Sequence, residues 1–174
     1  MDDGGFDVWY RAEHRRVAAV LVALSADPDV AEDATDEAFA RALDRWSEVA
    51  GMDRPEAWVV TVALNCLRRT LRRRTLERAL WRRRPPERGA DQLALPRPEL
   101  WAAVRALPER QRLAVVLRYV ADLPEADVAA VMGVSRGTVA ASLSAARGRL
   151  ADALGEATPR ACQLDCVRAQ VVIG

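Results

Sequence analysis

The sequence predicts an all-α protein with two small helical domains joined by a flexible linker. Apolar residues recur at helical spacing in both halves of the 174-residue chain, and no stretch of useful length alternates apolar and polar residues as a strand would. The helical pattern fails between Thr75 and Pro98, where prolines, a glycine and a run of arginines replace it. We therefore expect a first domain over residues 1–76, a linker over 77–98, a second domain over 99–154 and a tail over 155–174.

Three helices are expected in the first domain, separated by two breaks. The stretch Ala26–Asp29 (ADPD) interrupts the first apolar pattern, and Asp29 is a candidate N-cap for the second helix because its carboxylate can accept a backbone amide of the first turn. Gly51 and Pro55 mark the next break, since glycine permits unusual dihedral angles and proline suits a first helical turn. The expected helices cover about 6–24, 29–46 and 56–74.

Four helical segments are expected in the second domain. Breaks are predicted at Pro108, Pro124 and Gly133, because proline and glycine interrupt helices. Ser135 is a good N-cap for the last segment, and the short turn before it has the spacing of a helix-turn-helix unit. Such a unit also occurs in helical proteins that do not bind DNA. The expected segments are Glu99–Ala106, Glu109–Val120, Glu125–Met132 and Arg136 to about Leu154.

Charge is segregated along the chain, although the net charge is only +1. All 26 basic side chains are arginines, and ten of them fall between Arg68 and Arg88. Six acidic residues, with no basic residue among them, fall between Asp27 and Glu37. Such segregation indicates one basic partner and one polyanion, with solvated helix faces as the alternative interpretation.

The sequence indicates neither an enzyme nor a metal or cofactor site. It holds no nucleophile with a nearby base and no phosphate-binding glycine loop, and His14 is the single histidine. Cys162 and Cys166 leave a redox pair or two metal ligands as an alternative, but no further cysteine or histidine lies near them. Because no signal peptide and no run of about 20 apolar residues is present, we expect a cytoplasmic protein without membrane insertion.

Seven short motifs follow one another along the chain. The first half carries DVAED at 29–33, EAFARA at 37–42, PEAW at 55–58 and ALN at 63–65. The second half carries LPERQR at 107–112, LRY at 117–119 and GVSRGTV at 133–139. In this order and spacing the motifs resemble regions 2 and 4 of bacterial RNA polymerase sigma factors of the extracytoplasmic-function type. The resemblance covers about residues 6–154.

The resemblance implies that the acidic second helix docks on the clamp of core RNA polymerase. A cluster of carboxylates suits charge-complementary docking, which steers encounter with a basic partner. Helix capping is the alternative role for Glu32 and Asp33, and it explains Asp36 and Glu37 less easily. The implied polymerase contacts are Glu32, Asp33, Asp36, Glu37 and Arg41. Core RNA polymerase, promoter DNA and an anti-sigma factor are the implied partners.

The resemblance also implies a site for the minus-ten promoter element. A protein that holds unstacked bases needs a shaped pocket, stacking surfaces and cationic contacts to the backbone. The loop Gly51–Arg54 would capture a flipped base, and polar residues of the third helix would line the adjoining DNA track. Trp58 is interpreted as a core residue, and a buried amide is the alternative for Asn65. The implied minus-ten residues are Gly51, Asp53, Arg54, Asn65, Arg68, Arg69 and Arg72.

The last helix should lie in a DNA groove with a face of small side chains. A helical wheel separates a core face of Val139, Leu143, Ala146 and Leu150 from a groove face of Gly137, Ala140, Ala141, Ser144 and Ala145. Guanine readout needs arginine or lysine, whereas alanine offers only apolar contact to a thymine methyl, so we expect weak base reading and positioning by phosphate contacts. The implied minus-thirty-five residues are Arg112, Arg118, Arg136, Thr138, Ala140, Ala141, Ser144 and Arg147.

Together these features predict a sigma factor that binds core RNA polymerase, directs it to specific promoters and promotes DNA opening for transcription initiation. The groove-facing alanines motivate the alternative. It is a stand-alone helix-turn-helix DNA-binding regulator, or a sigma-like interaction protein that has lost promoter reading.

Overall fold

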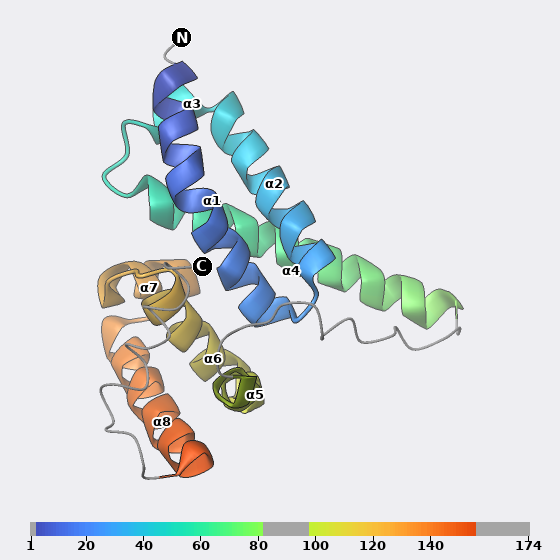
Figure 1. Cartoon of the computed structure of the whole chain (residues 1–174), viewed down its shortest axis with the longest axis vertical. Coiled ribbons are helices and arrows are strands. Elements are labelled where there is room, and N and C mark those ends of the chain that lie inside the picture. Colours follow the sequence, from blue (N-terminus) through green and yellow to red (C-terminus); the bar gives the residue numbers. More distant parts are fainter. Residues whose placement is uncertain (1–2, 82–97, 156–174) are drawn as a thin grey trace. The chain divides into compact units, whose positions relative to one another are not determined.

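A computed structural model describes residues 3–81 and 98–155 of the chain. The described residues are helical with short connections and contain no strand, so the expected all-α fold class is confirmed (Figure 1). They fall into two compact units, one on each side of the gap, and each unit is described by itself.

The first unit is built from three long helices and one short one. Helix α1 (Asp3–Ser25) lies beside α2 (Pro28–Asp44), and α4 (Pro55–Trp81) crosses both, with its C-terminal half extending beyond α2 (Figure 1). The short helix α3 (Trp46–Val49) begins where the second predicted helix was expected to end. Apolar side chains from all three long helices fill the core between them, including Val20, Leu21, Phe39, Val59 and Leu64.

The N-cap of α2 is Asp27, and the prediction of Asp29 was wrong. One carboxylate oxygen of Asp27 accepts the backbone amide of Val30 at 3.1 Å. Pro28 occupies the first helical position, which suits a residue without an amide proton, so the cap is the residue before it. The other carboxylate oxygen of Asp27 accepts Nη1 of Arg74 at 2.7 Å, which ties α4 to the start of α2.

Helix α4 begins where predicted and is longer than predicted at its C-terminal end. It begins at Pro55 and continues to Trp81, into the segment expected to be a linker. No glycine or proline lies between these two residues, and the next proline is Pro85, so nothing in the local sequence ends the helix earlier. The remainder of the expected linker, 82–97, and the expected tail after residue 155 lie outside the described residues.

Aromatic side chains hold one end of the first unit together. Phe6 of α1 packs edge-on against Trp46 of α3, with ring centroids 5.3 Å apart. Trp9 lies 5.2 Å from Phe39 of α2 and 5.1 Å from Trp46, so the same cluster joins α1, α2 and α3. Offset and edge-on ring pairs add to the stabilisation that burial of the rings provides. The cluster thereby anchors the segment that leads into the 50–54 loop.

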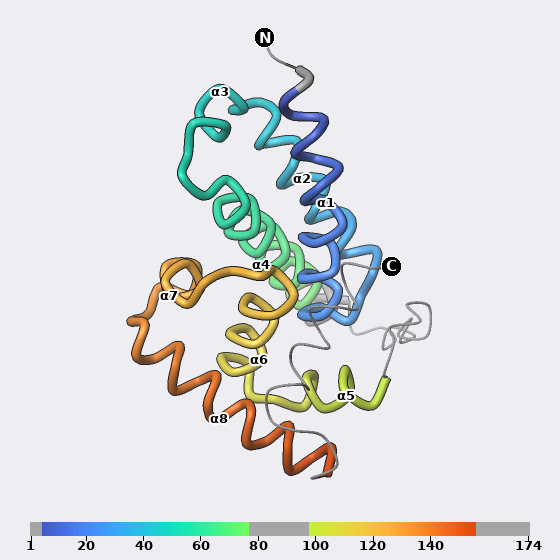
Figure 2. The backbone as a smooth tube through the Cα atoms, turned by 60° about the vertical axis from the view of Figure 1, so that its left-hand side comes forward, coloured from blue at the N-terminus to red at the C-terminus, as the bar shows by residue number. Residues whose placement is uncertain are grey.

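The second unit packs three shorter helical segments against one long helix. It contains α5 (Pro98–Ala106), α6 (Glu109–Val115) with the π-helical turn η1 (Val116–Val120), α7 (Glu125–Met132) and α8 (Arg136–Leu154). Helix α8 packs against α5, α6 and α7 (Figure 2). The core between them includes Leu100, Trp101, Leu117, Leu143 and Leu150. The four predicted segments therefore match the observed ones closely.

The turn between α7 and α8 has helix-turn-helix geometry, and the two helices meet at 102°. Gly133 ends α7 with a left-handed φ of 65°. Its amide donates to the carbonyl of Ala130 at 3.2 Å, and the amide of Val134 donates to the carbonyl of Ala129 at 3.0 Å, which is a Schellman motif. Ser135 then caps α8 by accepting the amide of Thr138 at 3.2 Å, as predicted.

Within residues 3–81 and 98–155, no single helix combines the length and apolar character needed to cross a membrane; only α7 and α8 taken together, bent by 102°, meet those criteria. The same residues hold no cluster of His, Cys, Asp and Glu side chains suited to a metal ion.

Candidate polymerase and nucleic-acid surfaces

The acidic face of α2 is opposite its buried face. Ala31, Ala34, Ala38 and their buried neighbours fix α2 against the core, so the intervening carboxylates must face outward. Glu32 and Asp33 are exposed, and neither forms an ion pair within the part of the chain that the structure describes. They are the two predicted polymerase contacts that the fold leaves available.

Asp36 is also exposed, but it has a partner inside the unit. Its Oδ1 lies 3.0 Å from Nε2 of His14 on α1. The His14 ring also packs against Tyr10, with centroids 4.7 Å apart, and against Phe39 at 5.3 Å. Asp36 is therefore part of the α1–α2 contact as well as of the acidic face.

Glu37 is placed differently from the other acidic residues. It is half-buried between α2 and α4, where Arg69 donates to its Oε1, and Arg41 one turn along α2 donates to the same oxygen at 2.6 Å. The hydrogen bond from Arg69 is the main reason why the pKa of Glu37 lies below the ordinary carboxyl value, with both arginines adding charge attraction. Glu37 and Arg41, which were expected to contact polymerase, thus form one ion-pair cluster with Arg69, which was expected to contact DNA.

Cys66 lies beneath this cluster on the inner face of α4 and is buried. Burial raises the pKa of its thiol, and the nearby negative charge of Glu37 raises it further. A thiol in this environment stays protonated and contributes to packing.

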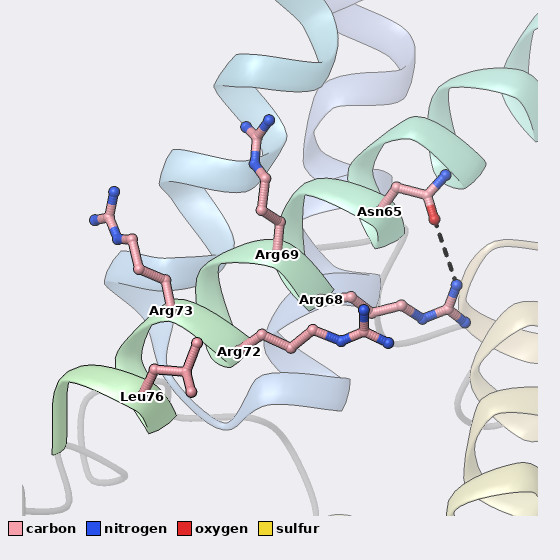
Figure 3. A pocket seen from close by; sticks show the side chains of 6 residues that line it. All are labelled: Asn65, Arg68, Arg69, Arg72, Arg73 and Leu76. Atoms are coloured by element: carbon pink, nitrogen blue, oxygen red, sulfur yellow. Dashed lines mark hydrogen bonds between the residues drawn. The ribbon is translucent and has the colours of Figure 1, made fainter. Parts of the chain in front are cut away.

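A basic groove runs along the outer face of α4 (Figure 3). It encloses about 600 Å³ and is lined by Asn65, Arg68, Arg69, Arg72, Arg73 and Leu76. Asn65 is exposed, and its Oδ1 accepts Nη1 of Arg68 at 3.4 Å, so the alternative of a buried amide is excluded. Four of the predicted minus-ten residues therefore share one groove.

The groove also contains residues that the sequence interpretation missed. Arg73 and Leu76 follow Arg69 at helical intervals of four and seven, so they continue the same face. Leu76 is 65% exposed, which places an apolar side chain at the end of the basic groove. The periodicity was visible in the sequence, but the helix was expected to end near these residues.

The loop before α4 presents the remaining minus-ten candidates. Gly51 and Asp53 are exposed, and Arg54 is paired with Glu56 at 2.6 Å. Trp58 at the start of α4 is half-buried, whereas its neighbour Val59 is fully buried in the core. The interpretation of Trp58 as a core residue therefore holds only for the buried part of its side chain. The loop ends where α4 begins, and the groove residues lie further along that helix.

The exposed and buried faces of α8 are those that the helical wheel predicts. Val139, Leu143, Ala146 and Leu150 are buried. The opposite side exposes the five small residues of the expected groove face, Gly137, Ala140, Ala141, Ser144 and Ala145. Arg136, Thr138 and Arg147 are exposed as well, so they are available for phosphate contacts.

Two of the predicted minus-thirty-five residues have partners inside the second unit. Nη1 of Arg112 donates to the carbonyl of Arg105 at 2.9 Å. Nη1 of Arg118 donates to the carbonyl of Leu123 at 3.4 Å and lies 3.7 Å from Oδ1 of Asp122. Both arginines are half-buried, so they brace the connections on either side of α6 and η1. The partners of these two arginines do not lie on α8, which carries the exposed arginines Arg136 and Arg147.

Comparisons with known proteins match both units. Residues 9–77 match the family model Sigma-70 region 2, and residues 97–150 match the family model Sigma-70, region 4. The RNA polymerase sigma-E factor of Streptomyces antibioticus is 32% identical over 118 residues, which cover 67% of this chain and 66% of that protein. The sigma-E factor of Streptomyces coelicolor is 28% identical over 136 residues, covering 77% of each.

A solved structure has the same fold. It is the sigma factor RpoE in complex with the anti-sigma factor NepR from Bartonella quintana, with a TM-score of 0.69 and 24% identity, and the match covers 86% of this chain and 96% of that one. The two family models span most of the described chain and occur in the order that the motifs predicted. The chain therefore belongs to the sigma-70 family, a non-enzymatic family of transcription initiation factors, and is a sigma factor of the extracytoplasmic-function type.

Proposed function

We propose that this sigma factor binds core RNA polymerase, directs it to promoters and helps to open the minus-ten region. One observation carries the proposal: an acidic face on α2 and a basic groove on α4 lie on packed helices of the same unit. Such an arrangement can contact a basic protein and a polyanion at the same time.

Each surface supports a different contact. Glu32 and Asp33 of α2 are the carboxylates that dock on the polymerase. The groove on α4, together with the 50–54 loop, holds the separated strand of the minus-ten element, because arginines along a helix can follow a phosphate backbone. Arg136 and Arg147 of α8 position the second domain on duplex DNA upstream.

We further propose that an anti-sigma factor controls this protein, by analogy with RpoE of Bartonella quintana, which is described in complex with one. The polymerase and the chromosome that such a factor serves are in the cytoplasm, so we place its action there. No catalytic group, metal or cofactor is needed for these contacts.

Reconstitution with core RNA polymerase tests the proposed function. Gel filtration of the purified chain with core enzyme is expected to give a complex, and this complex should produce discrete transcripts from fragments of the source genome. Core enzyme alone is the control. Absence of a complex, together with absence of any promoter-dependent transcript, would show that the chain does not act as a sigma factor.

The uncharged face of α8 supports a second candidate function. Ala140, Ala141 and Ala145 offer no hydrogen bond to a base edge, which suits a protein that has kept the sigma fold without promoter reading. Polymerase binding without transcription would favour a sigma-like interaction protein. Tight, sequence-specific duplex binding in the absence of polymerase would favour a stand-alone regulator.

A further inference from the structure

Arg69 lines the basic groove, but its charged end is turned out of it. Figure 3 shows the side chains of Arg68 and Arg72 extending along one direction, whereas Arg69 points away from them toward α2. There its guanidinium donates to Oε1 of Glu37. The side chain of Arg69 is 62% exposed, so the contact with Glu37, and not burial, holds it in this direction.

The charges around Glu37 favour retention of Arg69. Arg41 also donates to Oε1 of Glu37, at 2.6 Å, and this bond helps to keep the carboxylate ionised and oriented. Arg72, in contrast, has no carboxylate partner within the part of the chain that the structure describes, and Arg68 donates only to the neutral amide of Asn65. Of Arg68, Arg69 and Arg72, therefore, Arg69 is neutralised by a carboxylate, whereas the other two have no carboxylate partner in the described part of the chain.

We propose that Glu37 is a positioning residue that withholds Arg69 from nucleic acid, so that the free sigma factor offers the charges of Arg68 and Arg72, but not that of Arg69, to a phosphate backbone. This proposal rests on the proposed function for the identity of the ligand, the separated strand of a promoter. It changes the role of Glu37 from a polymerase contact to a residue that limits the DNA-binding charge of α4.

The salt dependence of binding distinguishes this role from simple helix bracing. Each phosphate that an arginine neutralises on single-stranded DNA adds about 0.7 to the slope of log K against log salt concentration. A residue that only braces α2 against α4 would change thermal stability and leave this slope unaltered. The slope therefore counts the arginines that reach the backbone.

The experiment measures binding of the full-length chain to a short, fluorescently labelled single-stranded oligonucleotide by anisotropy over a range of salt concentrations. Glu37→Gln should steepen the slope by about 0.7, because Arg69 is released to the groove. The single variant Arg69→Gln should have the same slope as the unmodified protein. In the double variant with Glu37→Gln, Arg69→Gln should abolish the steepening of the slope. Arg72→Gln should make the slope shallower by about 0.7.

Glu48→Gln provides a matched control. It removes one carboxylate and releases Arg45, which is bound to Glu48 at 2.6 Å, but neither residue lines the groove. The slope should therefore stay unaltered in this variant. Circular dichroism verifies that each variant is folded, and if Glu37→Gln is not, Arg69→Gln alone decides the question.

The proposal is overturned by an unaltered slope in folded Glu37→Gln, by a shallower slope in the single variant Arg69→Gln, or by no oligonucleotide binding at low salt. These results need no polymerase. The proposed function is tested separately, by complex formation with core enzyme, so failure of one proposal can be distinguished from failure of the other.

Discussion

Glu37 of α2 and Arg69 of α4 form an ion pair that joins the acidic and basic surfaces of the first unit. They are 32 residues apart in the sequence, and the family resemblance implies different partners for them, polymerase for Glu37 and promoter DNA for Arg69. Arg41 completes the cluster at 2.6 Å from Glu37. The contact therefore reduces the number of charges that each surface can offer to its partner.

The Glu37 cluster should make stability depend on pH in acid. The folded-state pKa of Glu37 lies below its ordinary value of 4.5, so its contribution to stability is present above pH 4.5 and is lost as the pH falls through the folded-state pKa. Glu37→Gln should thus lower Tm at neutral pH, and the difference from the unmodified protein should shrink in more acidic buffers. Thermal denaturation over a pH series measures this. Glu32→Gln, which breaks no ion pair of the described chain, should change Tm less at neutral pH.

Charge reversal at the available end of the acidic face should weaken polymerase binding. The double variant Glu32→Arg with Asp33→Arg places like charges opposite a basic partner, so we expect roughly a tenfold to hundredfold loss of affinity, which corresponds to about 1.4–2.8 kcal/mol. Fluorescence titration with core enzyme measures it. The charge-matched variant Asp7→Arg with Glu48→Arg, at exposed positions of α1 and α3, should bind nearly normally. Equal affinities for both variants would remove α2 as the docking face.

Two glycines of the second unit should respond in opposite ways to the same substitution. In Gly133→Ala the new methyl group meets open space, but the alanine backbone must keep the left-handed φ of 65°, which costs about 1–2 kcal/mol. Gly148→Ala adds a methyl group in open space within α8 and should stabilise the helix by about 0.5–1 kcal/mol. Calorimetry of the full chain should show a lower Tm for the first variant and a higher Tm for the second. A Tm shift of the same sign for both would contradict the turn geometry.

Longer side chains on α8 should strengthen duplex binding. Ala140→Lys with Ala141→Arg adds two cations to the exposed face, so affinity for promoter duplex should rise and its salt dependence should steepen. A change in the set of transcribed promoters is expected if the new side chains reach base edges. Ala102→Lys with Ala106→Arg, on exposed positions of α5, is the charge-matched control. If this control gives the same gain, the effect is one of net charge and α8 is not the DNA-binding face.

Cys66 should resist alkylation in the folded protein. The thiol is buried, and burial raises its pKa, so the reactive thiolate is scarce at neutral pH. Iodoacetamide followed by peptide mass spectrometry should show modification at Cys66 only after denaturation. Rapid labelling of Cys66 in the native state would indicate that the interface between α2 and α4 opens readily.

Much of the fold was predictable because it depends on local rules. The two faces of α8 followed from a repeat of 3.6 residues. The end of α7 followed from the left-handed conformation that Gly133 permits, and the start of α8 from the capping side chain of Ser135, both of which act within one turn. The cap of α2 was misplaced by two residues because the sequence offers two aspartates around Pro28, and the position of the proline decides between them. The end of α4 was missed because the prolines and the glycine between 85 and 98 were taken to end the helical pattern near Thr75, although residues 75–81 contain neither residue type.

The sequence by itself determined the helical class, the order of regions 2 and 4, and which side of each helix is polar, since these depend on spacing along one element. Only the tertiary structure decided which charges are available. Arg112 and Arg118 have partners within their own unit, and Arg69 is held by Glu37 across the packing of α2 and α4. An ion pair depends on the distance between atoms of separate helices, and no local pattern of residues specifies that distance.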